Sequence, residues 1–221
     1  MQLIKLPDPL LLQKVEDAIQ SERLMRYLPA AGGEVSAAFE LYLWNCTLGE
    51  SFFVSLHFAE ILCRNAIHRH LVDRLGDQWF RNQTFVGLLN PRHQREIADA
   101  VKDETAQHQG SCTHHHVVSA LTFGFWQHLL TKRFERLLWS HGIHCSFAAA
   151  PAAATREDAY LLVEAIRRWR NRIAHHRAIF DKRPMKMHQE SLRMINWVCP
   201  DTGKWVASVS KVPLALSLRP K

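Results

Sequence analysis

The stretch TREDAYLLVEAIRRWRNRIAHHRAIF, residues 155–180, says most about the fold of this chain. Thr155 followed three residues later by Asp158 forms a capping box, which is typical of a helix start. Apolar residues then recur every three or four positions, the period of an α-helix with one buried face. We therefore expect a long helix from Arg156 to about Ala178.

The same period extends over most of the 221 residues, and no stretch alternates convincingly with a period of two. Helix starts of the Asp-Pro or Asn-Pro kind occur at Asp8 and Asn90. Further helices are expected over 35–74 with a break near Gly49, over 117–140, over about 190–198 after a stop at Pro184, and from Pro200 onward. The sequence thus predicts an all-α fold, a single-domain bundle of about five to seven helices, the long ones packed antiparallel.

The domain boundaries follow from the first glycine pair. Residues 1–34 read as an N-terminal helix and linker, ended by Pro29 and the pair Gly32-Gly33, and residues 35–221 as the main helical domain. A chain of this length builds one sizeable core, so we expect one continuous globular domain over 1–221.

The amino-acid composition indicates the broad class of protein to which the chain belongs. The chain is 47% hydrophobic and 22% charged, as in a soluble globular protein. Its apolar runs are shorter than the roughly 18 to 20 residues of a membrane span, and its N-terminus lacks the pattern of a secretory signal. We expect no membrane-spanning helix and a cytoplasmic location.

Cysteine and histidine usage predicts neither disulfides nor metal. The five cysteines are an odd number without CxxC spacing, which favours buried free thiols. The run His114–His116 lies near Cys112, and His141 and His144 lie near Cys145, but neither group has the spacing of a zinc site. The sequence therefore predicts no metal ion and no cofactor, and these histidines read as solvated.

The net charge of +7 is concentrated in one window. Residues 167–186 hold eight basic side chains and one acid, Asp181, so the rest of the chain is neutral. Such a window predicts a surface that binds a polyanion. The other interpretation is a solvated helix end, where cations favour the negative pole of the helix dipole.

Two charged groups interrupt apolar stripes. Arg170 lies in line with Val163, Ile166 and Ile173, where a guanidinium is costly unless it is paired, and no acid lies one helical turn away. Glu60 and Arg64 interrupt another stripe as an i, i+4 pair. They form either a structural ion pair or a support for the site around Arg170, with Glu60 orienting Arg170 or His175.

Asn171 and His175 stand one helical turn apart, next to Arg170. This Arg-Asn-x3-His pattern resembles the R-x4-6-H motif of HEPN domains, helical folds that include many metal-independent endoribonucleases. From Tyr27 onward the chain resembles the Abi-like branch of abortive-infection proteins. The supporting segments are Leu41-Tyr42-Leu43-Trp44-Asn45, Glu60-x3-Arg64-Asn65, Phe123-Gly124-Phe125-Trp126, and Trp197-x2-Pro200 with Trp205.

The chemistry of these residue types agrees with what the resemblance implies. Histidine titrates near neutrality and can act as general acid or base on the RNA 2′-hydroxyl, so His175 is the candidate for that role. Arg170 can hold phosphate oxygens, and Asn171 can hydrogen-bond the phosphate or the imidazole. The products expected from the resemblance are a 2′,3′-cyclic phosphate and a 5′-hydroxyl. Candidate RNA-binding residues are Arg167, Arg168, Arg172, His176 and Arg177.

One imidazole does not conveniently serve as both acid and base, and His176 lies about 100° around the helix from His175. A second copy meeting the first along the Arg170 seam would supply the missing group, and the resemblance also implies a homodimer with a composite active site. An antitoxin protein is a possible partner. The alternatives are a non-catalytic HEPN-like module that binds RNA or a protein partner, and an inactive subunit that a partner neutralises or that neutralises a partner.

Overall fold

The computed structural model of this protein describes residues 8–19, 21–110 and 112–220, and these contain helices but no strand. The α-helices are α1 (Pro9–Ile19), α2 (Val35–Ser51), α3 (Phe53–Leu75), α4 (Gln83–Leu88), α5 (Pro91–Gln107), α6 (His114–Ala120), α7 (Phe123–His128), α8 (Glu135–Leu138), α9 (Arg156–Ala174), α10 (Pro184–Val198), α11 (Pro200–Val209) and α12 (Val212–Ser217). Seven of these described helices have ten residues or more. The all-α prediction is confirmed, and short helical segments add to the five to seven expected.

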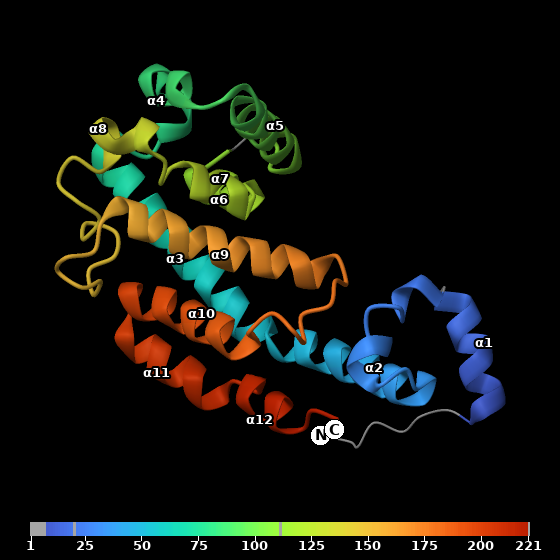
Figure 1. The fold of residues 1–221 in the computed structure, drawn as a ribbon. Helices are drawn as coiled ribbons and strands as arrows, with labels where there is room; N and C mark the ends of the chain where they lie inside the picture. Colours follow the sequence, from blue (N-terminus) through green and yellow to red (C-terminus); the bar gives the residue numbers. More distant parts are fainter. Residues whose placement is uncertain (1–7, 20, 111, 221) are drawn as a thin grey trace.

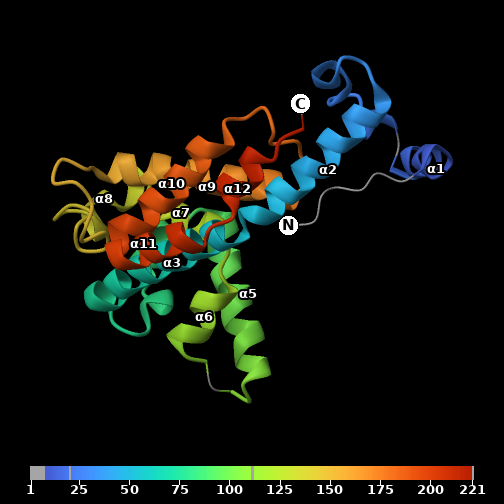
Figure 2. The ribbon, with the colours of Figure 1, turned by 90° about the horizontal axis from the view of Figure 1, so that it is seen from below.

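Helix α3 runs through the middle of the molecule, and α9, α10 and α11 pack beside it (Figure 1). Helix α10 packs against α3, α9 and α11, while α7 packs against both α3 and α9. Helix α12 contacts α2 and α10. Helices α5 and α6 pack against each other and project away from the bundle (Figure 2).

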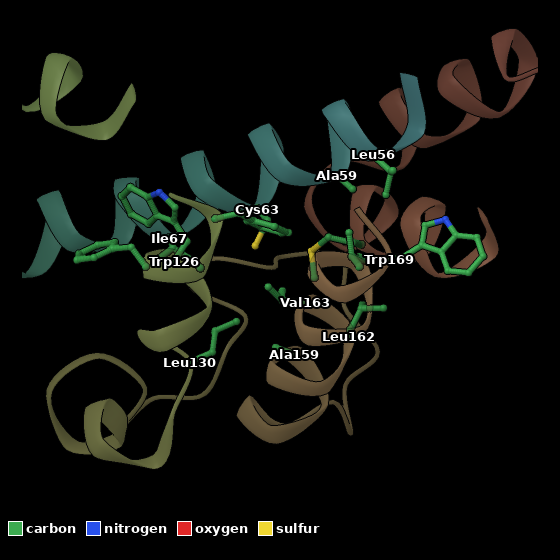
Figure 3. Packing of buried hydrophobic residues seen from close by; sticks show 14 of the residues in the cluster. Leu56, Ala59, Cys63, Ile67, Trp126, Leu130, Ala159, Leu162, Val163 and Trp169 are labelled. Carbon is green, nitrogen blue, oxygen red and sulfur yellow. The ribbon is translucent and has the colours of Figure 1, made fainter. Parts of the chain in front are cut away.

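The main core lies between α3 and α9. Figure 3 shows side chains of α3 facing those of α9, with Trp126 and Leu130 closing one end. The labelled residues of the two helices are Leu56, Ala59, Cys63 and Ile67 on α3 and Ala159, Leu162, Val163 and Trp169 on α9, all with at most 6% of their surface exposed. The apolar face read from the sequence of residues 155–174 is therefore the buried face of α9.

Several helix boundaries differ from the sequence prediction. The predicted helix over 117–140 is wrong, because Thr122 ends one helical segment and starts another: its side chain caps α7, and its N–H donates to Glu96 Oε1 at 2.7 Å. Pro184 does not stop a helix but stands at the first turn of α10, where its missing N–H costs nothing. The break between α2 and α3 falls at Phe52, three residues beyond Gly49.

The segment over 76–90 connects α3 to α5, and its aromatic residues hold it to the core. Trp79, Phe80 and Phe85 are indeed buried, with 0%, 2% and 0% of their surface exposed. Part of the segment is nevertheless helical, because Asn82 caps α4 by accepting the N–H of Phe85 at 3.0 Å. The capped starts expected at Asp8 and Asn90 are both present.

The connection between α1 and α2 packs against the main domain. Leu24 and Tyr27 are buried there, and the Tyr27 ring stacks on Phe180 at 5.0 Å. Helix α1 itself buries no residue and extends from one side of the bundle (Figure 1). The stretches of chain before and after residue 34 therefore pack against each other.

Helices α2 and α3 together form an almost continuous helical stretch of 41 residues, Val35–Leu75, whose most apolar window has a mean hydropathy of 1.2. By length and composition alone this stretch could cross a membrane. The central helix of a packed domain meets the same criterion, and a third of this window is buried inside the fold. The expectation of no membrane-spanning helix stays a prediction.

Buried histidines predict a loss of stability in mild acid. Burial lowers the pKa of His68 from 6.5 to about 4, aided by His114, and burial lowers the pKa of His128 to about 4, aided by His93. The folded protein therefore binds fewer protons than the unfolded chain between pH 6.5 and 4. The free energy of unfolding should be highest above this range and fall as pH drops through it, by up to about 1.4 kcal/mol for each unit of pKa shift.

Denaturant unfolding at a series of pH values measures this loss. His68→Gln, which cannot titrate, should give a shallower dependence of the free energy of unfolding on pH than the unmodified protein. An equal dependence in the two proteins would contradict the assignment to His68.

Candidate functional site

Helix α9 begins as the capping box predicts. The Thr155 hydroxyl accepts the N–H of Asp158 at 3.2 Å, and the Asp158 carboxylate accepts the N–H of Thr155 at 2.9 Å. These two bonds satisfy backbone donors that the first helical turn leaves without partners. The start and the register of α9 are therefore set by its own sequence.

Helix α9 ends at Ala174, four residues before the predicted end. His176 adopts a left-handed conformation with φ 53°, and its N–H donates to Ile173 O at 2.9 Å. The N–H of Arg177 donates to Arg172 O at 2.9 Å. This is a Schellman motif with histidine in the place that glycine usually takes. The backbone therefore reverses between His175 and Arg177.

The guanidinium of Arg170 is paired with Glu60 of α3. Nε of Arg170 donates to Glu60 Oε2 at 3.1 Å, and Nη2 donates to Oε1 at 2.9 Å. The same guanidinium donates from Nη1 to Asn171 Oδ1 at 3.2 Å. A two-point pair of this kind fixes the orientation as well as the charge of the arginine. The partner missing one turn away on α9 is thus supplied by α3.

The predicted pair between Glu60 and Arg64 does not occur in the described part of the chain. Nε of Arg64 instead contacts Asn65 Oδ1 at 3.4 Å. Glu60 faces α9, where Arg170 offers two parallel N–H groups, and a fork of this kind binds a carboxylate better than a single contact. Of the two roles considered for Glu60, its geometry is that of a group orienting Arg170.

Arg170 and Glu60 line a cavity of about 920 Å³ between α2, α3 and α9, here termed the Arg170 cavity. His176 and Arg177 line it as well, at the end of α9. The rest of the wall is largely apolar and includes Tyr42, Phe53, Leu56 and Ile173. Phe53 stands out at 71% exposure. The cavity therefore combines a fixed guanidinium with an apolar mouth.

Asn171 and His175 line a second, shallower hollow of about 720 Å³ on another face of α9, here termed the His175 hollow. Four cationic side chains line it: Arg168, Arg172, Arg177 and Lys182. The acid on its wall is Glu164, which pairs with Arg168 at 2.7 Å. This arrangement places an exposed imidazole and an amide among an excess of positive charge.

The expectation that Arg170, Asn171 and His175 share one space needs correction for a single chain. Arg170 contacts Asn171, and Asn171 lies in the His175 hollow, but Arg170 and His175 line different hollows. Glu60 draws the Arg170 side chain toward α3, and the early end of α9 turns His176 rather than His175 into the Arg170 cavity. Arg177 lines both hollows and lies between the two groups.

The predicted RNA-binding residues differ in exposure and in the hydrogen bonds that their side chains already make. Arg167 points to α7, where its Nε donates to Gln127 Oε1, so this guanidinium belongs to a packing contact. Nε of Arg172 donates to Ala178 O at 2.7 Å and supports the chain reversal. Arg168 has a side chain 73% exposed, and His176 and Arg177 are exposed. These three are the more accessible of the five.

Sequence reasoning missed the part that Asn45 plays in placing the site. Asn45 is 7% exposed, and its Oδ1 accepts the N–H groups of Ile179 at 2.8 Å and Phe180 at 3.1 Å. These bonds hold the segment after His176 against α2. The available signal was a polar residue directly after the apolar run Leu41–Trp44, because a buried amide needs partners.

Five tryptophans belong to the core, whereas the cysteines differ in exposure. Trp44, Trp126, Trp139, Trp169 and Trp197 are each at most 7% exposed, so these rings pack in the core. Trp169, the neighbour of Arg170, packs against Phe52 with ring centroids 5.2 Å apart. The five cysteines are free, as predicted, and Cys63 is buried as predicted. The prediction of burial is wrong for Cys46 and Cys145, which are exposed.

Comparison of the chain with protein-family models, with curated proteins and with solved structures gives no match. The case for a function therefore depends on the residues and on the geometry described above.

Proposed function

We propose that this chain is a metal-independent endoribonuclease of the HEPN type, serving an abortive-infection or toxin–antitoxin defence system. The observation that carries the proposal is the His175 hollow, where an exposed imidazole and the Asn171 amide lie among four cationic side chains. A surface of this kind suits a phosphate-bearing chain. The Abi-like resemblance supplies the reaction class.

In the proposed reaction the 2′-hydroxyl of the RNA attacks the neighbouring phosphorus, and the 5′-oxygen leaves. The bond from the 2′-oxygen to phosphorus forms as the bond to the 5′-oxygen breaks, giving a 2′,3′-cyclic phosphate and a 5′-hydroxyl. DNA lacks this internal nucleophile. His175 transfers one of the two protons involved, from the 2′-hydroxyl or to the leaving oxygen.

Arg170 and the cations around the hollow stabilise the negative charge that the phosphoryl oxygens carry in the transition state. Glu60 and Asn171 occupy three of the five N–H donors of Arg170 in the described part of the chain, so two remain for a phosphate oxygen. The Asn171 oxygen accepts from Arg170, which leaves the amide N–H₂ to donate elsewhere. We assign Glu60 the role of a positioning residue for this guanidinium, and Arg64 a place behind the site beside Asn65.

A second copy of the chain completes the proposed site. Each chain supplies one proton-transfer group, His175. Within one chain, Arg170 and His175 line different hollows. In the proposed twofold pairing, the Arg170 of one copy lies near the His175 of its partner, and the symmetry of the interface repeats this contact. Phe53, exposed at the mouth of the Arg170 cavity, supplies apolar surface for such a contact.

The competing function is a binding module in which the same cations hold RNA without cleaving it. The excess of cations over acids around the His175 hollow supports this binding function as well as it supports cleavage. In both cases affinity for RNA falls as salt rises, because bound cations release counterions from the RNA. Cleavage and the chemistry of the cut ends separate the two functions.

The decisive experiment incubates the purified full-length protein with total RNA in the presence of a chelator. We expect fragments with 2′,3′-cyclic phosphate and 5′-hydroxyl ends, and no cutting of the matching DNA. Specific activity should fall on dilution if two copies form the site. RNA that is bound but left whole in this assay, over the full range of protein concentration, would favour the binding module.

A further inference from the structure

The paired helices α5 and α6 bring three metal-ligating side chains together. Glu104 and His108 stand one turn apart near the end of α5, and His116 lies in the first turn of α6. One ligand atom from each of the three lies within 4.8 Å of those of the other two, and all three residues are partly buried. The group is thus formed by two helices and not by one run of histidines.

The distances within this group suit a small divalent cation. Glu104 Oε2 and His108 Nε2 are 3.3 Å apart. Two donors that each lie about 2.0–2.1 Å from a tetrahedral zinc ion are separated by roughly the same distance. The rings of His108 and His116 stack at 3.8 Å with an interplanar angle of 12°. Two imidazoles and one carboxylate form a donor set that zinc accepts, with a fourth position left for water.

Binding requires one ring to turn, because parallel rings direct their nitrogen lone pairs side by side and not to one point. The His108 side chain is 38% exposed, so it has room to turn. His116 gives up one contact on binding, because its Nδ1 accepts the N–H of Thr113 at 3.3 Å within the α6 capping box. That bond uses the lone pair of Nδ1 and leaves the ring proton on Nε2, so a metal ion on either nitrogen replaces it.

Of the three histidines in the first α6 turn, His116 lies against α5, and the rings of the other two lie beside His68. His114 turns to α3, where its Nδ1 lies 3.0 Å from Nε2 of the buried His68. His115 is exposed. His116 turns to α5 and stacks on His108. His115 is therefore a matched control, being a histidine one position from the proposed ligand but outside the cluster of three.

We propose that Glu104, His108 and His116 bind one divalent cation of the zinc class, which fastens the end of α5 to the start of α6. The sequence grouped His116 with its neighbours and with Cys112, and predicted no metal site. The proposed ligands are residues 104 and 108, one turn apart near the end of α5, and residue 116 of α6. The site is separate from the proposed nuclease residues on α9, so its existence does not depend on RNA cleavage.

The test is a titration of the metal-free full-length protein with Co²⁺, followed by visible absorption, and then displacement of the Co²⁺ by Zn²⁺. We compare the unmodified protein with His108→Ala, Glu104→Gln and His115→Ala, after circular dichroism has shown equal helicity. Loss of an outer-shell partner alone weakens metal affinity by about 10- to 100-fold. The loss of a direct ligand should therefore weaken Co²⁺ binding by at least about tenfold.

The proposal expects one equivalent of Co²⁺ in the unmodified protein and in His115→Ala, and weakened binding in both other variants. Amide hydrogen exchange in α6 should slow when Zn²⁺ is added to the unmodified protein, and should not slow in His108→Ala. Two results would overturn the proposal: no saturable Co²⁺ absorption, or equal weakening in His115→Ala and His108→Ala.

Discussion

Replacing His175 by alanine should reduce RNA cleavage by at least about 100-fold while leaving affinity for RNA nearly unchanged. The imidazole is assigned a proton transfer in the reaction, whereas the cations that line the His175 hollow remain in the variant. Single-turnover cleavage of a defined RNA, together with its dissociation constant at fixed salt, measures the two effects separately. A binding module would show neither cleavage nor any difference between the two proteins.

The neighbouring His176 provides the control for the His175→Ala variant. His176 lines the Arg170 cavity, and His175 lines the hollow that contains Asn171. His176→Ala should therefore retain most of the single-turnover cleavage rate at saturating protein, although its affinity for RNA should fall. The opposite result, with His176→Ala inactive and His175→Ala active, would move the reaction into the Arg170 cavity and refute the role given to His175.

The Arg170→Lys variant tests whether cleavage needs the planar guanidinium of residue 170 or only its positive charge. Lysine keeps the positive charge, but it lacks the planar fork that Arg170 presents to Glu60. We expect this variant to cleave far more slowly than the unmodified protein, and Glu60→Gln to show a smaller loss of the same kind. Unchanged cleavage and unchanged folding in Glu60→Gln would remove Glu60 from the site.

Replacing Phe52 by alanine should lower the free energy of unfolding by about 3–5 kcal/mol, because a fully buried aromatic ring is lost and a cavity is left. Phe52 is 0% exposed at the junction of α2 and α3. Its ring packs against Trp169 of α9 at 5.2 Å and against His188 of α10 at 6.2 Å. The residue thus joins the central helix to the helix that carries the candidate site.

Phe53 provides the matched control one position along. It is 71% exposed, so Phe53→Ala should change the free energy of unfolding by no more than about 0.5 kcal/mol. Denaturant unfolding of both variants measures the difference. Similar losses in the two would contradict the packing described at the junction of α2 and α3.

Local signals in the sequence predicted the parts of the fold that depend on nearby residues. The capping box at Thr155, the caps at Asp8 and Asn90, and the buried stripe of α9 all appear in the structure. The helix over 117–140 was wrong because Thr122 bonds to Glu96 of another helix. A hydrogen bond across 26 residues leaves no trace in the period of apolar side chains.

The sequence by itself determined the all-α class, the start and buried face of α9, and the concentration of positive charge around its end, since each follows from spacing within a few helical turns. Only the tertiary structure decided that Glu60 holds Arg170, that Asn45 anchors the chain beyond His176, and that Arg170 and His175 open on different hollows. The physical reason is that a charged or amide group on a helix face takes the partner that folding brings to it. The partner of Arg170 lies 110 residues away, and that of Asn45 lies 134 residues away, beyond the reach of any local pattern.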